Sequence, residues 1–269
     1  MNLPVKIIAW MRPANLVRNA ALFGAIALAP IYGKAQATAA QPPDIHNIIL
    51  VHGAWADGSS WDKVIPLLEE KGFHVTAVHL PFTTLADDAA TVERAVALQD
   101  GPVLLVGHSY GGAVITEAGD DPKVAGLVYV AAFAPDQGQS VIGQNSQYPP
   151  TPGDTQFRSD ANGFIMLTYP GVADDFAQDL TPLEKRLIFA TQGQVSGPNE
   201  IEAPLTTAAW RQKPDFYIVA DRDRMIDPEL EEQIAEQMNA TTIHISSSHV
   251  PMLSHPVQVA NFIATAAGK

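Results

Sequence analysis

Short apolar runs alternate with amphipathic stretches along most of the chain. Runs rich in β-branched residues predict strands at 47–51, 74–80, 103–107, 124–133, 216–220 and 242–246. Apolar residues at helical spacing predict helices at about 61–71, 85–99, 228–238 and 256–266, with a further helix starting just after Ser109. Because strands alternate with helices, we expect an α/β fold with a mostly parallel central sheet and helices on both faces.

This alternation stops between residues 134 and 214. Residues 135–163 are rich in Pro, Gly, Gln, Asn and Ser, and helical patterns follow at 174–179 and 182–192. The region shows no strand pattern, and it lies between two predicted core strands. Such an insertion is typical of a cap over an active site, so we expect a small helical cap at 134–214. The alternative is a surface insertion that does not cover an active site.

The first forty residues differ from the rest of the chain. Basic residues without an acid are followed by an apolar run from Ala20 to Ala29 and then by Ala35-Gln36-Ala37. This order predicts a secretory signal peptide at 1–37 and one domain at 38–269. The apolar run is about half of the roughly 20 residues that a membrane span needs, which argues against a permanent anchor. A native amphipathic helix is a further alternative. We expect an exported protein, periplasmic or secreted from a bacterium.

Composition and charge narrow the classes of function. Of 269 residues, 46% are hydrophobic and 17% charged, which suits a globular core and argues against disorder. The net charge of −13 disfavours nucleic acid and anionic membranes as partners. The chain has no cysteine, so it forms no disulfide and no thiolate metal site. We expect a small molecule as partner, with no metal or organic cofactor.

Residues 107–111, Gly-His-Ser-Tyr-Gly, lie between an apolar strand and a helix. A serine on such a sharp turn needs small residues two positions away on either side, because the chain folds back on itself there. The turn places the hydroxyl at a helix N-terminus, where negative charge is stabilised. Ser109 is therefore the candidate nucleophile. A glycine-rich structural turn with an idle serine is the alternative.

A serine hydroxyl needs a positioned base, which in this architecture comes late in the chain. His249 follows the last predicted strand directly and is the candidate base. His255 is the rival, although it stands one loop further on at a helix start. We expect His108 to pack beside the sheet and His52 to have a structural role at its turn.

The acid that orients this histidine is expected in the loop after the fifth strand. Asp221, Asp223 and Asp227 all lie there. Asp227 precedes a proline and suits a helix N-cap, whereas Asp221 terminates the strand. Position favours Asp223 at the apex of the loop. Asp221 and Asp136, which follows the fourth strand, remain alternatives.

Two backbone N–H groups are expected to bind the oxyanion of the reaction. One belongs to Tyr110, directly after the nucleophile, and the other to the loop at 52–55, with Ala54 favoured. Gly53 and Trp55 in the same loop are candidate substrate contacts. Other large side chains that could line an acyl pocket are Phe82, Phe133, Tyr148, Phe164, Met166, Tyr169 and Phe176.

Several of these segments resemble the α/β-hydrolase superfamily. They are Val-His-Gly-Ala-Trp at 51–55, Gly-His-Ser-Tyr-Gly-Gly at 107–112, Tyr-Ile-Val-Ala at 217–220 and Ser-His-Val-Pro-Met-Leu at 248–253. The most similar group contains small carboxylesterases such as plant methylesterases and salicylate-binding esterases, together with hydroxynitrile lyases. The resemblance covers nearly the whole chain after the leader, the cap least well. It implies an α/β-hydrolase fold, places the acid on Asp223, and places the oxyanion hole on Ala54 and Tyr110.

The resemblance admits two reactions, and two positions separate them. Hydroxynitrile lyases of this group carry a threonine where this chain has Gly53 and a lysine where it has Val250. We therefore expect a serine hydrolase that cleaves carboxylic esters, or lactones, through an acyl-enzyme on Ser109, His249 and Asp223. A non-catalytic receptor for small ligands, a lyase-like activity and an amidase are the alternatives.

Overall fold

Six parallel strands form one sheet in the computed structural model, which describes residues 45–269. Their spatial order is β2-β1-β3-β4-β8-β9. The strands are β1 (Asn47–Val51), β2 (His74–Ala77), β3 (Val103–Ser109), β4 (Val124–Ala132), β8 (Asp215–Ala220) and β9 (Thr241–Ile245). All six were predicted, but β3 runs on to Ser109 and β2 ends at Ala77. The predicted signal peptide lies outside the described residues.

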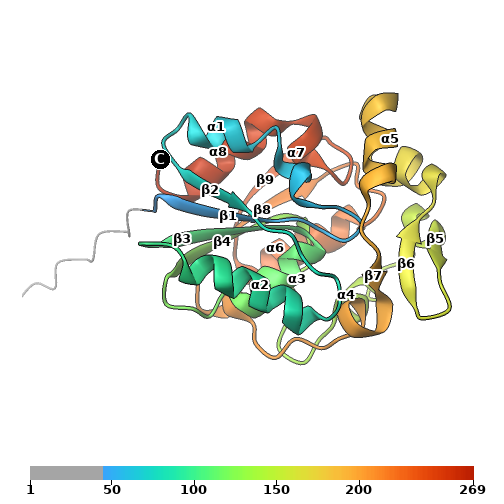
Figure 1. Ribbon diagram of the computed structural model, residues 1–269, viewed down its shortest axis with the longest axis horizontal. Coiled ribbons are helices and arrows are strands. Elements are labelled where there is room, and N and C mark those ends of the chain that lie inside the picture. The colour runs from blue at the N-terminus through green and yellow to red at the C-terminus, as the bar shows by residue number, and fades with distance from the viewer. Residues whose placement is uncertain (1–44) are drawn as a thin grey trace, which may run out of the picture. The chain divides into compact units, whose positions relative to one another are not determined.

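Helices cover both faces of this sheet, with α1 and α8 on one face and α2 and α3 on the other (Figure 1). The helices of this part are η1 (Gly58–Trp61), α1 (Ile65–Glu69), α2 (Leu85–Ala97), α3 (Tyr110–Ala118), α6 (Pro228–Met238), α7 (Pro251–Ser254) and α8 (Pro256–Ala266). The single helix predicted at 61–71 is instead the 3₁₀ turn η1 followed by α1. Pro66 lies in the first turn of α1, where a missing N–H costs nothing, so a new helix begins there.

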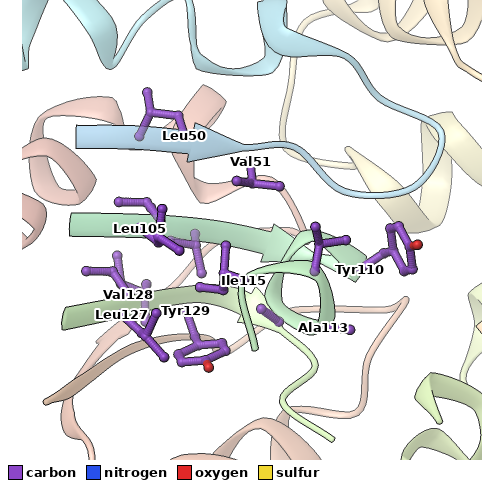
Figure 2. Packing of buried hydrophobic residues seen from close by; sticks show 14 of the residues in the cluster. Leu50, Val51, Leu105, Tyr110, Ala113, Ile115, Leu127, Val128 and Tyr129 are labelled. Carbon is purple, nitrogen blue, oxygen red and sulfur yellow. The ribbon is translucent and has the colours of Figure 1, made fainter. Parts of the chain in front are cut away.

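The hydrophobic core is centred on β3, the strand that lies between β1 and β4 in the sheet. Every residue of β3 is buried, as expected for a strand covered on both faces. Figure 2 shows Leu105 of β3 near Leu127 of β4 and Ile115 of α3, with Leu50 of β1 on the other face of the sheet. A leucine this deeply buried typically contributes about 2–5 kcal/mol relative to alanine. The strand that carries Ser109 at its end is therefore firmly held.

The insertion between β4 and β8 corrects one prediction, because it contains strands. A small antiparallel sheet is formed by β5 (Phe157–Ser159), β6 (Phe164–Leu167) and β7 (Val195–Ser196). The expectation of a purely helical insertion was wrong, because strands of two to four residues are too short for alternation to be visible. The helices of the insertion are α4 (Val141–Asn145), η2 (Pro152–Thr155), η3 (Gly171–Phe176), α5 (Pro182–Thr191), η4 (Gly197–Ile201) and η5 (Ala209–Arg211).

The insertion lies at the edge of the sheet where parallel strands end. Figure 1 shows α5 and the small sheet beyond the carboxyl ends of β1 and β3. In open α/β sheets, ligands bind at this edge. Among residues 45–269, no helix is long and apolar enough to span a bilayer.

Candidate active site

Ser109 occupies a strained turn at the end of β3, directly before α3. Its φ of 52° and ψ of −122° lie where residues other than glycine are rarely found. The turn is tight because the chain doubles back: a Cβ on Gly107 would lie 2.5 Å from the carbonyl oxygen of Gly111. The glycine pattern read from the sequence thus has a steric cause, and it presents the Ser109 side chain at the sheet edge.

The loops after β8 and β9 bring Asp223 and His249 together. His249 Nδ1 lies 2.5 Å from Asp223 Oδ2, and both side chains are buried. Asp223 Oδ1 accepts hydrogen bonds from the backbone N–H groups of Met225 (2.7 Å) and Ile226 (3.0 Å). This fixes the carboxylate and orients the imidazole, with Nδ1–H as donor. His249 Nε2 is buried with no hydrogen-bond partner among the described residues, so its lone pair is available.

The three other aspartates that the sequence offered as the acid have different partners. Asp221 pairs with a histidine of β9 at the exposed surface. Asp227 caps α6, as predicted, and accepts a hydrogen bond from the backbone of Glu229 at 2.9 Å. Asp136 forms an ion pair with Arg211. Of the four aspartates, Asp223 is the one whose side chain contacts His249.

Two further histidines support the site from behind. His108 Nε2 donates to the backbone carbonyl of His249 at 2.8 Å, and the two rings lie 4.7 Å apart. Burial lowers the pKa of His108 well below its usual value, so this ring is neutral. His52 Nε2 accepts a hydrogen bond from the backbone N–H of Leu80 at 3.0 Å, and burial lowers its pKa to about 4. The rival base His255 bonds to Ser254 instead.

Ser109 and His249 line one cavity of about 450 Å³ together with Ala54, Trp55 and Tyr110. Its other lining is largely apolar and comes mostly from the insertion. Apolar members are Val141, Ile142, Tyr148, Phe157, Ile165 and Ile201. Of the seven large side chains considered from sequence, Phe133 and Tyr148 line this cavity. The volume is within the range of small-molecule sites.

Gly53 and Trp55, the two candidate substrate contacts, differ in their placement. Gly53 is absent from the cavity lining and packs against the turn that carries Ser109, where an added Cβ would lie 2.8 Å from that of Ser109. Trp55 lines the cavity, and it also lines a second cavity of about 300 Å³. Its Nε1–H donates to the carbonyl of Ile165 at 3.1 Å, and its ring lies 5.0 Å from that of Phe157. Trp55 thus connects the loop after β1 to the insertion.

A buried network of hydrogen bonds beside Ser109 was not expected from the sequence. The Tyr110 hydroxyl donates to Asp88 Oδ2 at 2.8 Å, and the backbone N–H of Phe82 donates to Asp88 Oδ1 at 3.1 Å. Glu200 of the insertion lies against Asp88. Burial and this neighbour raise the pKa of Glu200 to about 9, so Glu200 is protonated at neutral pH. No pattern in the sequence marks these acids, because each lies in a segment that reads as solvated.

Comparison with known proteins adds to this geometry. The pyrethroid hydrolase of Sphingobium wenxiniae is 26% identical over 254 residues, covering 82% of this chain and 87% of that protein. Methylesterase 1 of Arabidopsis thaliana is 27% identical over 255 residues, covering 83% and 96%. The crystal structure of a pyrethroid hydrolase from Sphingobium faniae superposes with a TM-score of 0.72 at 24% identity, covering 83% of this chain and 98% of that one.

A family model described as the alpha/beta hydrolase family matches residues 48–262. The match runs from the second residue of β1 into α8, so it includes the central sheet, the insertion and the cavity. It confirms the resemblance and the fold expected from the sequence. The chain belongs to the alpha/beta hydrolase family.

Proposed function

We propose that this protein is a serine esterase in which Ser109, His249 and Asp223 form the catalytic triad. The observation that carries the proposal is the pair of His249 and Asp223: His249 Nε2 has no hydrogen-bond partner among the described residues, and His249 lines the same cavity as Ser109. A base held on one side by a carboxylate, with its other nitrogen unpartnered, is what activation of a serine requires. A methylesterase and pyrethroid hydrolases among the relatives support hydrolysis.

In the proposed reaction, Ser109 Oγ attacks the ester carbonyl carbon while its proton passes to His249 Nε2. The negative charge of Asp223 stabilises the imidazolium that forms. When the carbon–oxygen bond to the alcohol breaks, Nε2 returns this proton to the leaving oxygen. Water then attacks the acyl-enzyme by the same route, which releases the acid and restores the serine.

The oxyanion is assigned to the backbone N–H groups of Ala54 and Tyr110. Tyr110 is the first residue of α3, so its N–H has no acceptor within the helix. Ala54 lines the cavity on the opposite loop. Each such donor typically contributes about 10²–10³-fold to kcat.

We propose that the insertion acts as a cap that selects esters with a bulky apolar group. Most of the apolar lining of the cavity comes from residues 134–214, and a volume of about 450 Å³ exceeds the need of an acetyl group. Asp154 and Glu202 also line the cavity, which disfavours anionic substrates.

Two positions favour hydrolysis over cyanohydrin cleavage. A threonine in place of Gly53 would bring its Cβ to 2.8 Å from the Cβ of Ser109, so the turn has no room for it. Val250 is buried and offers no positive charge for cyanide.

Turnover of p-nitrophenyl acetate and butyrate tests the assignment. Ser109→Ala is expected to lose several orders of magnitude in kcat, while the exposed control Ser59→Ala keeps full activity. A fluorophosphonate probe is expected to label wild type and not Ser109→Ala. Equal turnover by wild type and Ser109→Ala would overturn the triad. A folded wild type that resists the probe would instead support a non-catalytic receptor, and labelling with turnover of anilides alone would support an amidase.

We also propose that the protein is exported by its N-terminal signal peptide. The basic, apolar and small-residue order of residues 1–37 supports this. N-terminal sequencing of the protein from a bacterial periplasm or culture medium is expected to begin at residue 38. An intact Met1 on protein in the cytosol would contradict it.

A further inference from the structure

Glu231 lies behind the proposed triad and has no role in the reaction as written above. It belongs to the first turn of α6 and is fully buried. Glu231 Oε2 accepts a hydrogen bond from the backbone N–H of Ala220 at 3.0 Å. Its other oxygen, Oε1, finds no donor among the described residues. Asp223 is bonded to the same residue, because its backbone N–H donates to the carbonyl of Ala220 at 2.9 Å, and the side chains of the two acids interact directly.

Two buried carboxyl groups in contact cannot both be ionised without a cation between them. The titratable groups that act on Glu231 are Asp223, Asp221 and Tyr217, and none of these three is a cation. One proton shared within the pair removes the repulsion. It also gives Oε1 a hydrogen-bond role, because a protonated Oε1 is a donor.

The contacts decide which of the two acids carries the proton. Asp223 accepts hydrogen bonds from two backbone N–H groups and from His249 Nδ1, all of which favour its ionised form. Glu231 accepts one bond, and burial followed by the charge of Asp223 raises its pKa well above its usual value. The proton therefore resides on Glu231.

We propose that Glu231 is a positioning residue for the triad: it stays protonated and donates a hydrogen bond that keeps the Asp223 carboxylate ionised and aimed at His249. This inference rests on the proposed function, because it acts through Asp223. It extends the chain of groups behind Ser109 by one residue. No proton moves from Glu231 during turnover, and its contribution is to hold the carboxylate in place.

The variants Glu231→Gln and Glu231→Leu separate this role from an ionised or a merely structural one. Glutamine copies a protonated glutamate, since its amide oxygen can accept from Ala220 and its NH₂ can donate to Asp223. Leucine removes both bonds at similar volume. Glu229→Gln is the matched control, because Glu229 is exposed on the same helical turn.

The measurement is kcat/KM for p-nitrophenyl butyrate as a function of pH, with a thermal melt of each variant. We expect Glu231→Gln and Glu229→Gln to stay within about threefold of wild type with an unchanged acid limb. Glu231→Leu is expected to lose about 10–100-fold in kcat with little change in KM. Its acid limb should move to higher pH, because the charge of Asp223, no longer shared with a donor, holds the imidazolium more strongly.

An ionised Glu231 gives the opposite sign, because both variants would remove a negative charge and move the acid limb to lower pH. That result, or a loss above about 30-fold in Glu231→Gln, would overturn the proposal. Glu231→Leu with an unmoved limb and only a lower melting temperature would reduce Glu231 to a structural residue and overturn it as well. A failure of the proposed function is distinguished from these outcomes, because Ser109→Ala would then turn over the ester as fast as wild type. An infrared measurement needs no turnover: the wild-type-minus-Glu231→Gln difference spectrum should show one C=O band of a protonated carboxylic acid, while the band of protonated Glu200 is common to both proteins and cancels.

Discussion

Two pairs of buried carboxyl groups lie near Ser109, and they belong to different parts of the molecule. Asp223 and Glu231 both belong to the sheet-and-helix core, where Asp223 contacts His249. Asp88 belongs to the core and Glu200 to the insertion, so the second pair joins two segments of the chain. In both pairs, a glutamate whose Oε1 has no partner within residues 45–269 lies against an aspartate that accepts several hydrogen bonds. The same chemistry therefore lies behind the proposed triad in one place and joins the insertion to the core in the other.

The largest expected effect belongs to the core pair. Asp223→Asn should leave the fold intact but lower kcat by about 10³–10⁴-fold, because the amide can no longer hold the imidazole with Nδ1–H as donor. Kinetics with p-nitrophenyl butyrate measure it. The matched variant Asp221→Asn, at an exposed position on the same loop, should behave as wild type. A similar loss in both variants would remove the distinction between the two aspartates.

Disruption of the Asp88–Glu200 pair should lower the free energy of unfolding rather than kcat. Asp88→Ala removes the acceptor of three donors, namely Tyr110, Glu200 and the backbone of Phe82. A buried donor left without its acceptor costs about 1–3 kcal/mol of unfolding free energy. Urea denaturation measures the loss, and limited proteolysis should cut within 134–214 before the core. The exposed neighbour Asp87→Ala is the control. Unchanged denaturation of Asp88→Ala would show that the insertion is held by other contacts.

The two pairs also predict how stability depends on pH. The pKa of Glu200 is raised from an ordinary 4.5 to about 9, so between these values the folded state holds a proton that the unfolded state releases. Stability must therefore fall as pH rises through this window. Glu200→Gln cannot ionise, and its melting temperature should exceed that of wild type by a margin that grows between pH 6 and pH 9, by about 2–4 °C for each kcal/mol of stability that wild type loses. Parallel melting curves for the two proteins across this range would refute a protonated Glu200.

Much of the core and of the site could be predicted from the sequence, because their determinants are local. Apolar runs define the six strands, and Pro228 and Pro256 mark helix starts that the structure places at the same residues. The glycine pattern around Ser109 follows from a steric need of one turn. Because parallel strands end at one edge, residues that follow β3, β8 and β9 were expected to meet there.

The insertion and the supporting acids could not be predicted, because their determinants are contacts between distant segments. Strands β5 to β7 are defined by pairing rather than by their own pattern. Glu200 and Glu231 look like ordinary solvated acids until the fold buries them. His108 was expected beside the sheet, and its bond to the backbone of His249 spans 141 positions of sequence.

Substitutions of Trp55 are expected to have the smallest effects. They test whether the core or the insertion determines which esters are preferred. The side chain borders both cavities and is tied to the insertion by one hydrogen bond, to Ile165. Trp55→Phe keeps most of the ring and loses the bond, which should cost about 0.5–1.5 kcal/mol of stability and leave ester preference unchanged. Trp55→Ala also removes the indole ring that borders both cavities, so the ratio of kcat/KM for p-nitrophenyl octanoate over acetate should rise several-fold. If Trp55→Phe shifts the acyl preference as much as Trp55→Ala, the hydrogen bond to the insertion sets specificity. In that case the size of the Trp55 ring, which borders both cavities, would not determine the acyl preference.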